Sequence, residues 1–211
     1  KFLQALGIPS SGDVIMFISR DGLRRFVPRP IFFVYRKVRA ELNRWKYHGS
    51  EYHCNVCASN LRAWINAGPV DHRNFVCPVC YSYGRHRMMA LVIENELLRD
   101  GTLIGKKFLH FAPEVGFQNW LKGFLPDIDY RSADLFSPGV DLCIDLQDIT
   151  LPNDSIDVVI LSHVLEHVDN DTQALHELNR ILAPGGKLFL QVPLSGEPQT
   201  IEDKLDTAAA R

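Results

Sequence analysis

The sequence contains no apolar run approaching the roughly 18 residues that a bilayer-spanning helix needs. The best candidate, residues 31–35, is followed at once by Arg36 and Lys37, so we expect no transmembrane segment. Internal repeats and low-complexity tracts are also missing, and no small-residue cleavage site follows an apolar stretch. We therefore expect a cytoplasmic protein. The chain begins with Lys1 rather than Met, which is typical of a fragment.

The net charge is also small, at −2 over 211 residues, but the charged residues are unevenly distributed along the chain. Residues 1–50 hold ten Lys or Arg and three Asp or Glu, whereas the remainder holds 13 and 22. Within this basic part, Pro28 and Pro30 precede residues 31–45, whose pattern predicts an amphipathic helix. Such a helix is more often solvated or docked on protein than bound to lipid, although peripheral contact with an anionic membrane stays open.

Cysteine is rare and concentrated: four of the five cysteines lie between residues 48 and 83. They form two C-x2-C pairs separated by nineteen residues, Cys54/Cys57 and Cys77/Cys80. Two such knuckles can complete a tetrahedral thiolate shell for Zn2+. The alternatives are two disulfides or buried free thiols, and the missing secretory features favour zinc.

A zinc ion held by four cysteines has no open position for water or substrate, so we expect a structural site. His53 and His72 are reserve ligands, although ordinary surface positions are the simpler interpretation. Cys143 stands alone in an apolar segment and is predicted to pack in the core.

From Gly84 onward the pattern is α/β. A helix is predicted over residues 85–99, and strands near 106–112, 128–134, 141–145, 156–162 and 186–192. The last two strands are joined through a helical segment, which makes them parallel and places a site at their carboxyl ends. Pro184-Gly185-Gly186 is predicted to form a turn that needs a positive φ.

The sequence motifs in these segments resemble those of a known family. An Asp-x-Val strand within Ser155–Val168, a Leu-Glu-His element and a Leu-x-Pro-Gly-Gly turn within Leu178–Pro193 occur in this order. The chain resembles class I S-adenosylmethionine (SAM)-dependent methyltransferases over about residues 104–195. Cys77-Pro-Val-Cys-Tyr-Ser-Tyr-Gly-Arg-His-Arg87 and the His110-x-Ala-Pro-Glu114 loop further resemble a bacterial, methyltransferase type 11-like branch of this family.

The resemblance implies an α/β, Rossmann-like sheet in residues 84–211, preceded by a four-cysteine zinc ribbon (48–83) and the basic helical leader (1–47). Class I members usually carry seven strands, but only eighteen residues follow Pro193. We therefore expect the last two strands to be missing and the domain to be incomplete at its C-terminus. An uncovered fifth strand would offer an edge for pairing between copies of the chain.

The resemblance also implies a cofactor site, although this chain departs from the usual Gly-x-Gly-x-Gly loop. His110 stands where an acid is expected, and Ala112 and Glu114 replace two glycines, so only Gly116 remains. Glu114 is predicted to pair with the methionyl ammonium. The alternative is a degenerate loop that binds nothing. The full set of expected SAM contacts is Ala112, Pro113, Glu114, Gly116, Asp134, Leu135, Asp145, Leu146, Ser162 and His163.

Within that set, Asp134 is expected to hold the ribose hydroxyls, and Asp145 with the following N–H to meet the adenine edge. Asp154 and Asp157 are expected to cap a turn.

Three residues after the fourth strand are candidates for the chemistry: His163, Glu166 and His167. Either histidine could remove a proton from the acceptor, with Glu166 orienting it or contacting the cofactor. The two histidines would share a face if the segment were helical. A metal-binding His-x-x-Glu-His element and simple helix capping are the alternatives.

Three functions stay open from the sequence. The first is a SAM-dependent methyltransferase for a small molecule or glycan. The second is an RNA methyltransferase with an N-terminal zinc module, disfavoured because the knuckles lack clustered basic residues and stacked aromatics. The third is a non-catalytic scaffold whose basic leader binds a membrane surface or an acidic protein.

Overall fold

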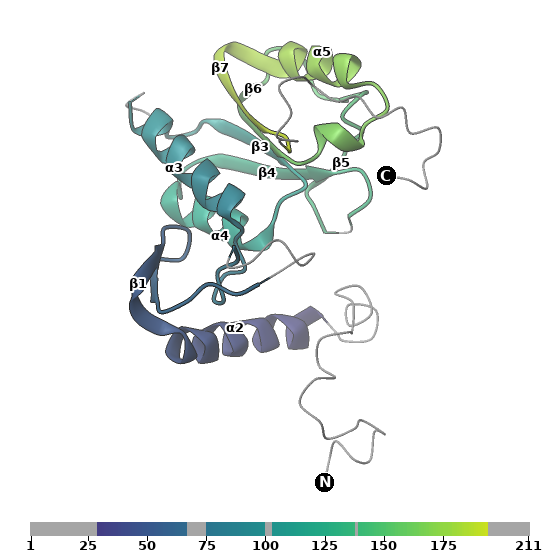
Figure 1. The fold of residues 1–211 in the computed structure, drawn as a ribbon. Helices are drawn as coiled ribbons and strands as arrows, with labels where there is room; N and C mark the ends of the chain where they lie inside the picture. The colour runs from purple at the N-terminus through teal and green to yellow at the C-terminus, as the bar shows by residue number, and fades with distance from the viewer. Residues whose placement is uncertain (1–28, 67–74, 100–102, 138, 194–211) are drawn as a thin grey trace, which may run out of the picture.

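The computed structural model describes residues 29–66, 75–99, 103–137 and 139–193 (Figure 1). Predictions for the first 28 residues, for His72 and for the residues after Pro193 lie outside these ranges. None of the described helices combines the length and apolarity of a membrane span. The elements are, in chain order, α2 (Arg29–Lys46), β1 (His48–Cys54), β2 (Ser59–Leu61), α3 (Gly84–Arg99), β3 (Lys107–Phe111), α4 (Val115–Phe124), β4 (Asp129–Asp134), β5 (Leu142–Cys143), β6 (Ile156–Ser162), the 3₁₀ helix η3 (Leu165–His167), α5 (Asp171–Ile181) and β7 (Leu182–Gln191).

Five parallel strands form the central sheet in the order β5-β4-β3-β6-β7. The central strands β3 and β6 are apolar almost throughout and buried along nearly their whole length, because helices cover both faces of the sheet. At the edge, β7 pairs only with β6 among the described strands. The predicted α/β, Rossmann-like parallel sheet is confirmed.

Helix α5 covers one face of the sheet, and α3 and α4 cover the other (Figure 1). On α5, Ala174, Leu178 and Ile181 recur at helical spacing and are fully buried, and Asn170 caps the helix by accepting the Gln173 N–H. On α3, the buried side chains are those of residues 86, 89, 90, 93 and 97, which again share one face.

The cysteine-bearing segment shares its hydrophobic core with the sheet. Cys54, Leu61 and Val79 belong to one buried cluster with Ile93 of α3 and Phe108 of β3. Helix α2 lies beyond this segment, at the far side from α5 (Figure 1). Its Asn43 side chain donates to the Pro78 carbonyl at 2.7 Å, which fixes the helix on the second knuckle.

Most predicted elements are confirmed, and three differ. The leader helix extends to residues 29–46, with Pro30 in its first turn, where a missing N–H costs nothing. Strand β5 shrinks to two residues at the edge of the sheet, so Cys143 is exposed rather than packed in the core. Strand β7 begins at Leu182, earlier than predicted, because the Pro-Gly-Gly turn lies within the strand, as a register irregularity in its pairing with β6. Gly185 in this turn has the predicted positive φ, at 77°.

Candidate functional site

The strand order locates the site. The chain runs from β3 outward to β5 and then returns to β6 on the other side of β3, so the order reverses between β3 and β6. Phe111 at the end of β3 pairs with Leu161 of β6, and the loops that follow therefore start side by side. Open α/β sheets bind ligands at this position, outside the carboxyl ends of the strands.

Both loops begin with a strained residue. Ala112 directly follows β3 with a φ of 45°, and His163 directly follows β6 with a φ of 55°. Residues with a Cβ adopt this left-handed region at a cost of about 1–2 kcal/mol. Such strain persists where surrounding structure enforces it, and it gathers at functional sites. At Ala112 the chain keeps the backbone shape that glycine usually supplies in this loop.

Glu114 is turned inward. It is the N-cap residue of α4, yet its side chain caps no backbone N–H. Its Oε1 instead lies 2.8 Å from Nε2 of His86 on α3, while its Oε2 is buried without a hydrogen-bond partner. The other ring nitrogen of His86, Nδ1, accepts the Tyr83 N–H at 3.2 Å, which leaves Nε2 to face the carboxylate, although the two atoms are not well aligned for a hydrogen bond.

The charge on Glu114 follows from this contact. Burial is the largest single influence and acts to raise the pKa of Glu114, but the contact with His86, together with nearby His110 and a backbone hydrogen bond, outweighs it and holds the pKa below its usual value. Glu114 is therefore ionised at neutral pH, with one oxygen against His86 and the other free to accept. The sequence did not reveal His86, although the Arg-His-Arg motif after the second knuckle contains it.

His110 belongs to the core. Its side chain is fully buried, its Nδ1 lies 2.8 Å from the Tyr130 hydroxyl, and its ring meets Phe117 edge-on. Burial lowers the pKa of His110 to about 4, so the imidazole is neutral at pH 7. His110 therefore supplies no charge where the family usually has an acid, and Glu114 is the acidic group of this loop.

Gly116 serves packing. A Cβ at this position would lie 2.5 Å from the carbonyl oxygen of Cys80, a distance that real side chains do not reach. The first turn of α4 thus rests directly on the second cysteine knuckle. Contact of Gly116 with a cofactor stays a prediction.

The ends of β4 and β5 supply the remaining predicted cofactor residues. Asp134 ends β4, where its Oδ1 accepts the N–H groups of Phe136 and Ser137 at 2.8 and 2.7 Å. Asp145 accepts the Gln147 N–H in a tight turn, and Leu146 is buried in the α5-side core. Asp134 and Asp145 both lie at the carboxyl edge, but each already braces its own loop. Neighbouring Leu135 is partly exposed, and Pro113 lies between Ala112 and Glu114.

The β6 loop brings two of the three predicted catalytic residues together. Nδ1 of His163 lies 3.0 Å from Oε1 of Glu166, and both side chains are partly exposed, at 29 and 25%. His163 precedes η3 and is not helical, so His163 and exposed His167 do not share a helical face. Ser162 is buried and its hydroxyl donates to the Gln191 side chain at 3.2 Å.

Asp154 and Asp157 lie away from this edge, and Asp157 contacts the start of β3 instead of capping its turn as predicted. Asp157 sits near the start of β6, where it pairs with Lys106 at 2.7 Å and accepts the Lys107 N–H at 2.9 Å. Asp154 has a φ of 53° in the preceding turn. A shallow hollow beside Asp157 and Gly185 also lies at this opposite edge and does not belong to the site.

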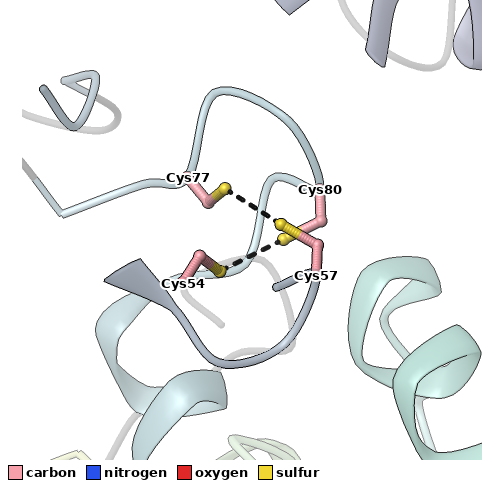
Figure 2. A group of neighbouring side chains, drawn as sticks. All are labelled: Cys54, Cys57, Cys77 and Cys80. Carbon is pink, nitrogen blue, oxygen red and sulfur yellow. Dashed lines mark hydrogen bonds between the residues drawn. The ribbon is translucent and has the colours of Figure 1, made fainter. Parts of the chain in front are cut away.

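The four predicted metal ligands converge on one point (Figure 2). The four sulfurs lie within 4.8 Å of one another, and the Cys54–Cys80 and Cys57–Cys77 pairs are each separated by 3.7 Å. A tetrahedral zinc ion with Zn–S bonds of about 2.3 Å places its sulfurs about 3.8 Å apart. All four cysteines are free thiols, so the geometry fits zinc and not disulfides.

The two knuckles have equivalent supporting groups. The residues after the second cysteine of each pair, Ala58 and Tyr81, both have positive φ, at 52° and 61°. One position further on, the hydroxyls of Ser59 and Ser82 lie 3.3 and 3.1 Å from Cys57 and Cys80. These hydroxyls can donate to thiolates and orient them.

His53, a reserve ligand in the sequence, instead pairs with Asn60 at 2.8 Å through Nδ1. It is not part of the cysteine cluster.

Comparison with known proteins agrees with the motifs. Residues 127–190 match a family model described as a methyltransferase domain. A malonyl-[acyl-carrier protein] O-methyltransferase from Alcanivorax borkumensis is 28% identical in an alignment of 134 residues that covers 54% of this chain and 45% of that protein. The chain therefore spans less than half the length of this curated relative. The resemblance to class I SAM-dependent methyltransferases is confirmed.

Two solved structures illustrate the structural likeness. The YcgJ protein from Bacillus subtilis aligns with a TM-score of 0.39 and 17% identity over half of each chain. The CurJ carbon methyltransferase aligns with a TM-score of 0.41 and 20% identity over 48% of this chain and 33% of that one.

Proposed function

We propose that the protein is a SAM-dependent methyltransferase whose acceptor is a small molecule or a glycan. The observation that carries the proposal is the pair of strained loops at the switch point. One loop holds an ionised carboxylate with an unpaired buried oxygen, and the other holds a paired histidine and glutamate. SAM carries a cationic ammonium, which the carboxylate of the first loop would bind. Its methyl group is already activated, so only the acceptor needs activation, which the histidine and glutamate of the second loop would provide.

Glu114 provides the fit to SAM. Its unpaired Oε2 is a strong acceptor, and an ammonium group is the donor that would compensate its burial. Asp134 would hold the ribose hydroxyls from the end of the neighbouring strand, using the oxygen that its loop leaves unused. When bound, SAM would supply a methyl group on a sulfonium centre.

His163 is the proposed base. Glu166 accepts from Nδ1 of His163, which leaves Nε2 as the nitrogen that can take a proton. A base in this position suits an acceptor that must lose a proton, such as a hydroxyl group of a glycan or small molecule. Alignment of acceptor and methyl group supplies the rest of the rate, because the two reactants are held together.

Replacing His163 with asparagine tests the base. Asparagine tolerates a positive φ better than other non-glycine residues, so the loop should keep its shape. Release of S-adenosylhomocysteine with a panel of hydroxyl-bearing small molecules and glycans should fall by about 10²–10⁴-fold, well beyond any loss of SAM affinity. An unchanged rate on an active acceptor would remove His163 from the mechanism.

Asp134 offers a test of the ribose contact. Asp134→Asn keeps an oxygen for the N–H groups of Phe136 and Ser137 but removes the charge, whereas Asp134→Ala removes both. We expect the alanine variant to weaken SAM binding by about 1.5–3 kcal/mol and the asparagine variant by part of that. Calorimetric titration measures both. Normal affinity in the folded asparagine variant, with loss only in the alanine variant, would reduce Asp134 to a loop brace.

A further inference from the structure

Helix α2 has one face fixed on the protein and one apolar face left open. The fixed face carries Ala40 and Asn43, which pack on the core and donate to Pro78. On the opposite side, the apolar side chains are exposed by 46 to 84%, with Trp45 the most exposed. This outer stripe consists of Val34, Tyr35, Val38, Leu42 and Trp45.

At 3.6 residues per turn, these five positions fall within a sector of about 100°. Isolated exposed apolar residues are ordinary, but a continuous stripe that ends in a tryptophan marks a binding surface. Among the residues that the structure describes, none buries this stripe.

Cations border the stripe on both sides. The same helical period places Lys37 and Arg44 along one edge and Arg39 and Lys46 along the other. Glu41, the single acid of residues 34–46, lies on the first of these edges, next to the stripe, and pairs there with Arg44 at 3.9 Å. Arg39 lies between the stripe and the second knuckle, at 6.0 Å from the centre of the Tyr35 ring and 5.3 Å from the centre of the Tyr81 ring.

We propose that this face of α2 binds an anionic membrane surface, with the stripe buried among acyl chains and the bordering cations at the lipid phosphates. An apolar face with cations along both edges and a Trp and a Tyr among its residues is the composition of helices that lie in the plane of a bilayer. The surrounding charge argues against a second copy of this chain as the occupant. Residues 34–46 carry five Lys or Arg and one acid, and a two-fold contact would bring these charges together.

The orientation is compatible with the rest of the fold. Asn43 and Ala40 hold the helix from behind, so the stripe could enter a bilayer without unpacking α2 from the knuckle. The proposal does not depend on methyl transfer and would hold for a protein of another activity.

The experiment uses the whole chain and vesicles of phosphatidylcholine, alone or mixed equally with phosphatidylglycerol. Co-sedimentation measures binding, and the difference in fluorescence between the protein and Trp45→Phe isolates the emission of Trp45. We expect binding to the anionic vesicles only, a blue shift of the Trp45 emission, and release at high salt.

Matched variants separate the two contributions. Leu42→Ser should weaken binding by about tenfold or more, and Leu175→Ser, the same change at an exposed site on α5, should leave it unchanged. Replacing Lys37, Arg44 and Lys46 together with glutamine should weaken it by about a hundredfold.

Three outcomes would overturn the proposal. The first is no binding to either kind of vesicle. The second is self-association that Leu42→Ser abolishes, since the stripe would then be an interface between copies. The third is equal loss of vesicle binding in Leu42→Ser and Leu175→Ser, since the contact would then not lie on α2.

Discussion

Removing the proposed zinc ion from the four cysteines is expected to abolish SAM binding, although no cysteine lies in the proposed cofactor site. The second knuckle supports that site in two ways. The Cys80 carbonyl packs on Gly116 in the first turn of α4, and the chain after Cys80 leads directly into α3, which carries His86 to Glu114. Zinc–thiolate sites contribute about 10–16 kcal/mol in small peptides, which is comparable to the whole stability of a domain.

Chelation and two serine variants measure this coupling. Elemental analysis should find about one zinc per chain, lost in Cys57→Ser and kept in Cys143→Ser, because Cys143 is exposed and outside the cluster. SAM affinity, measured by calorimetry, should follow the zinc content and return when zinc is added back. Metal-free protein that binds SAM normally would show that the two sites are independent.

Glu114→Gln is expected to weaken SAM binding by about tenfold or more. The change keeps the size of the side chain and removes the charge that an ammonium group would meet. Because the carboxylate also contacts His86, a purely structural role must be separated from a binding role. A second ligand separates the two roles. Because 5′-methylthioadenosine lacks the amino-acid portion of SAM, its affinity should not change in the variant.

A second variant completes the test. His86→Asn removes the partner of Glu114 but leaves the carboxylate in place. We expect it to lower the melting temperature and to weaken SAM binding less than Glu114→Gln does. If both variants lose stability equally, and folded Glu114→Gln binds SAM as the unchanged protein does, Glu114 only ties α4 to α3.

The sheet was predictable because its signals are local. Continuous apolar runs predicted β3 and β6, and the spacing of the cysteine pairs predicted a cluster whose sulfurs lie 3.7 Å apart. The sequence predicted Glu114 as the partner of the methionyl ammonium, but it gave no sign of a second partner within the protein. The structure adds His86, which approaches from a helix nearly thirty residues earlier in the chain.

Other features depend on tertiary context that no local pattern records. Cys143 was predicted to be buried, but the shortness of β5 places it at an exposed edge. The glycine at position 116 matched a cofactor-loop motif, whereas its missing Cβ is explained by the approach of a knuckle. The strain at Ala112 and His163 also follows from how the sheet positions both loops, since neither residue type signals it.

Calorimetric titration of the zinc-loaded protein with SAM and with S-adenosylhomocysteine tests the central claim most directly. The two ligands share the ammonium, the ribose and the adenine that Glu114, Asp134 and the Asp145 loop are proposed to meet. Both should therefore bind, at one site per chain. Absence of binding by either ligand to folded, zinc-loaded protein would contradict the proposed function and leave a methyltransferase-like scaffold.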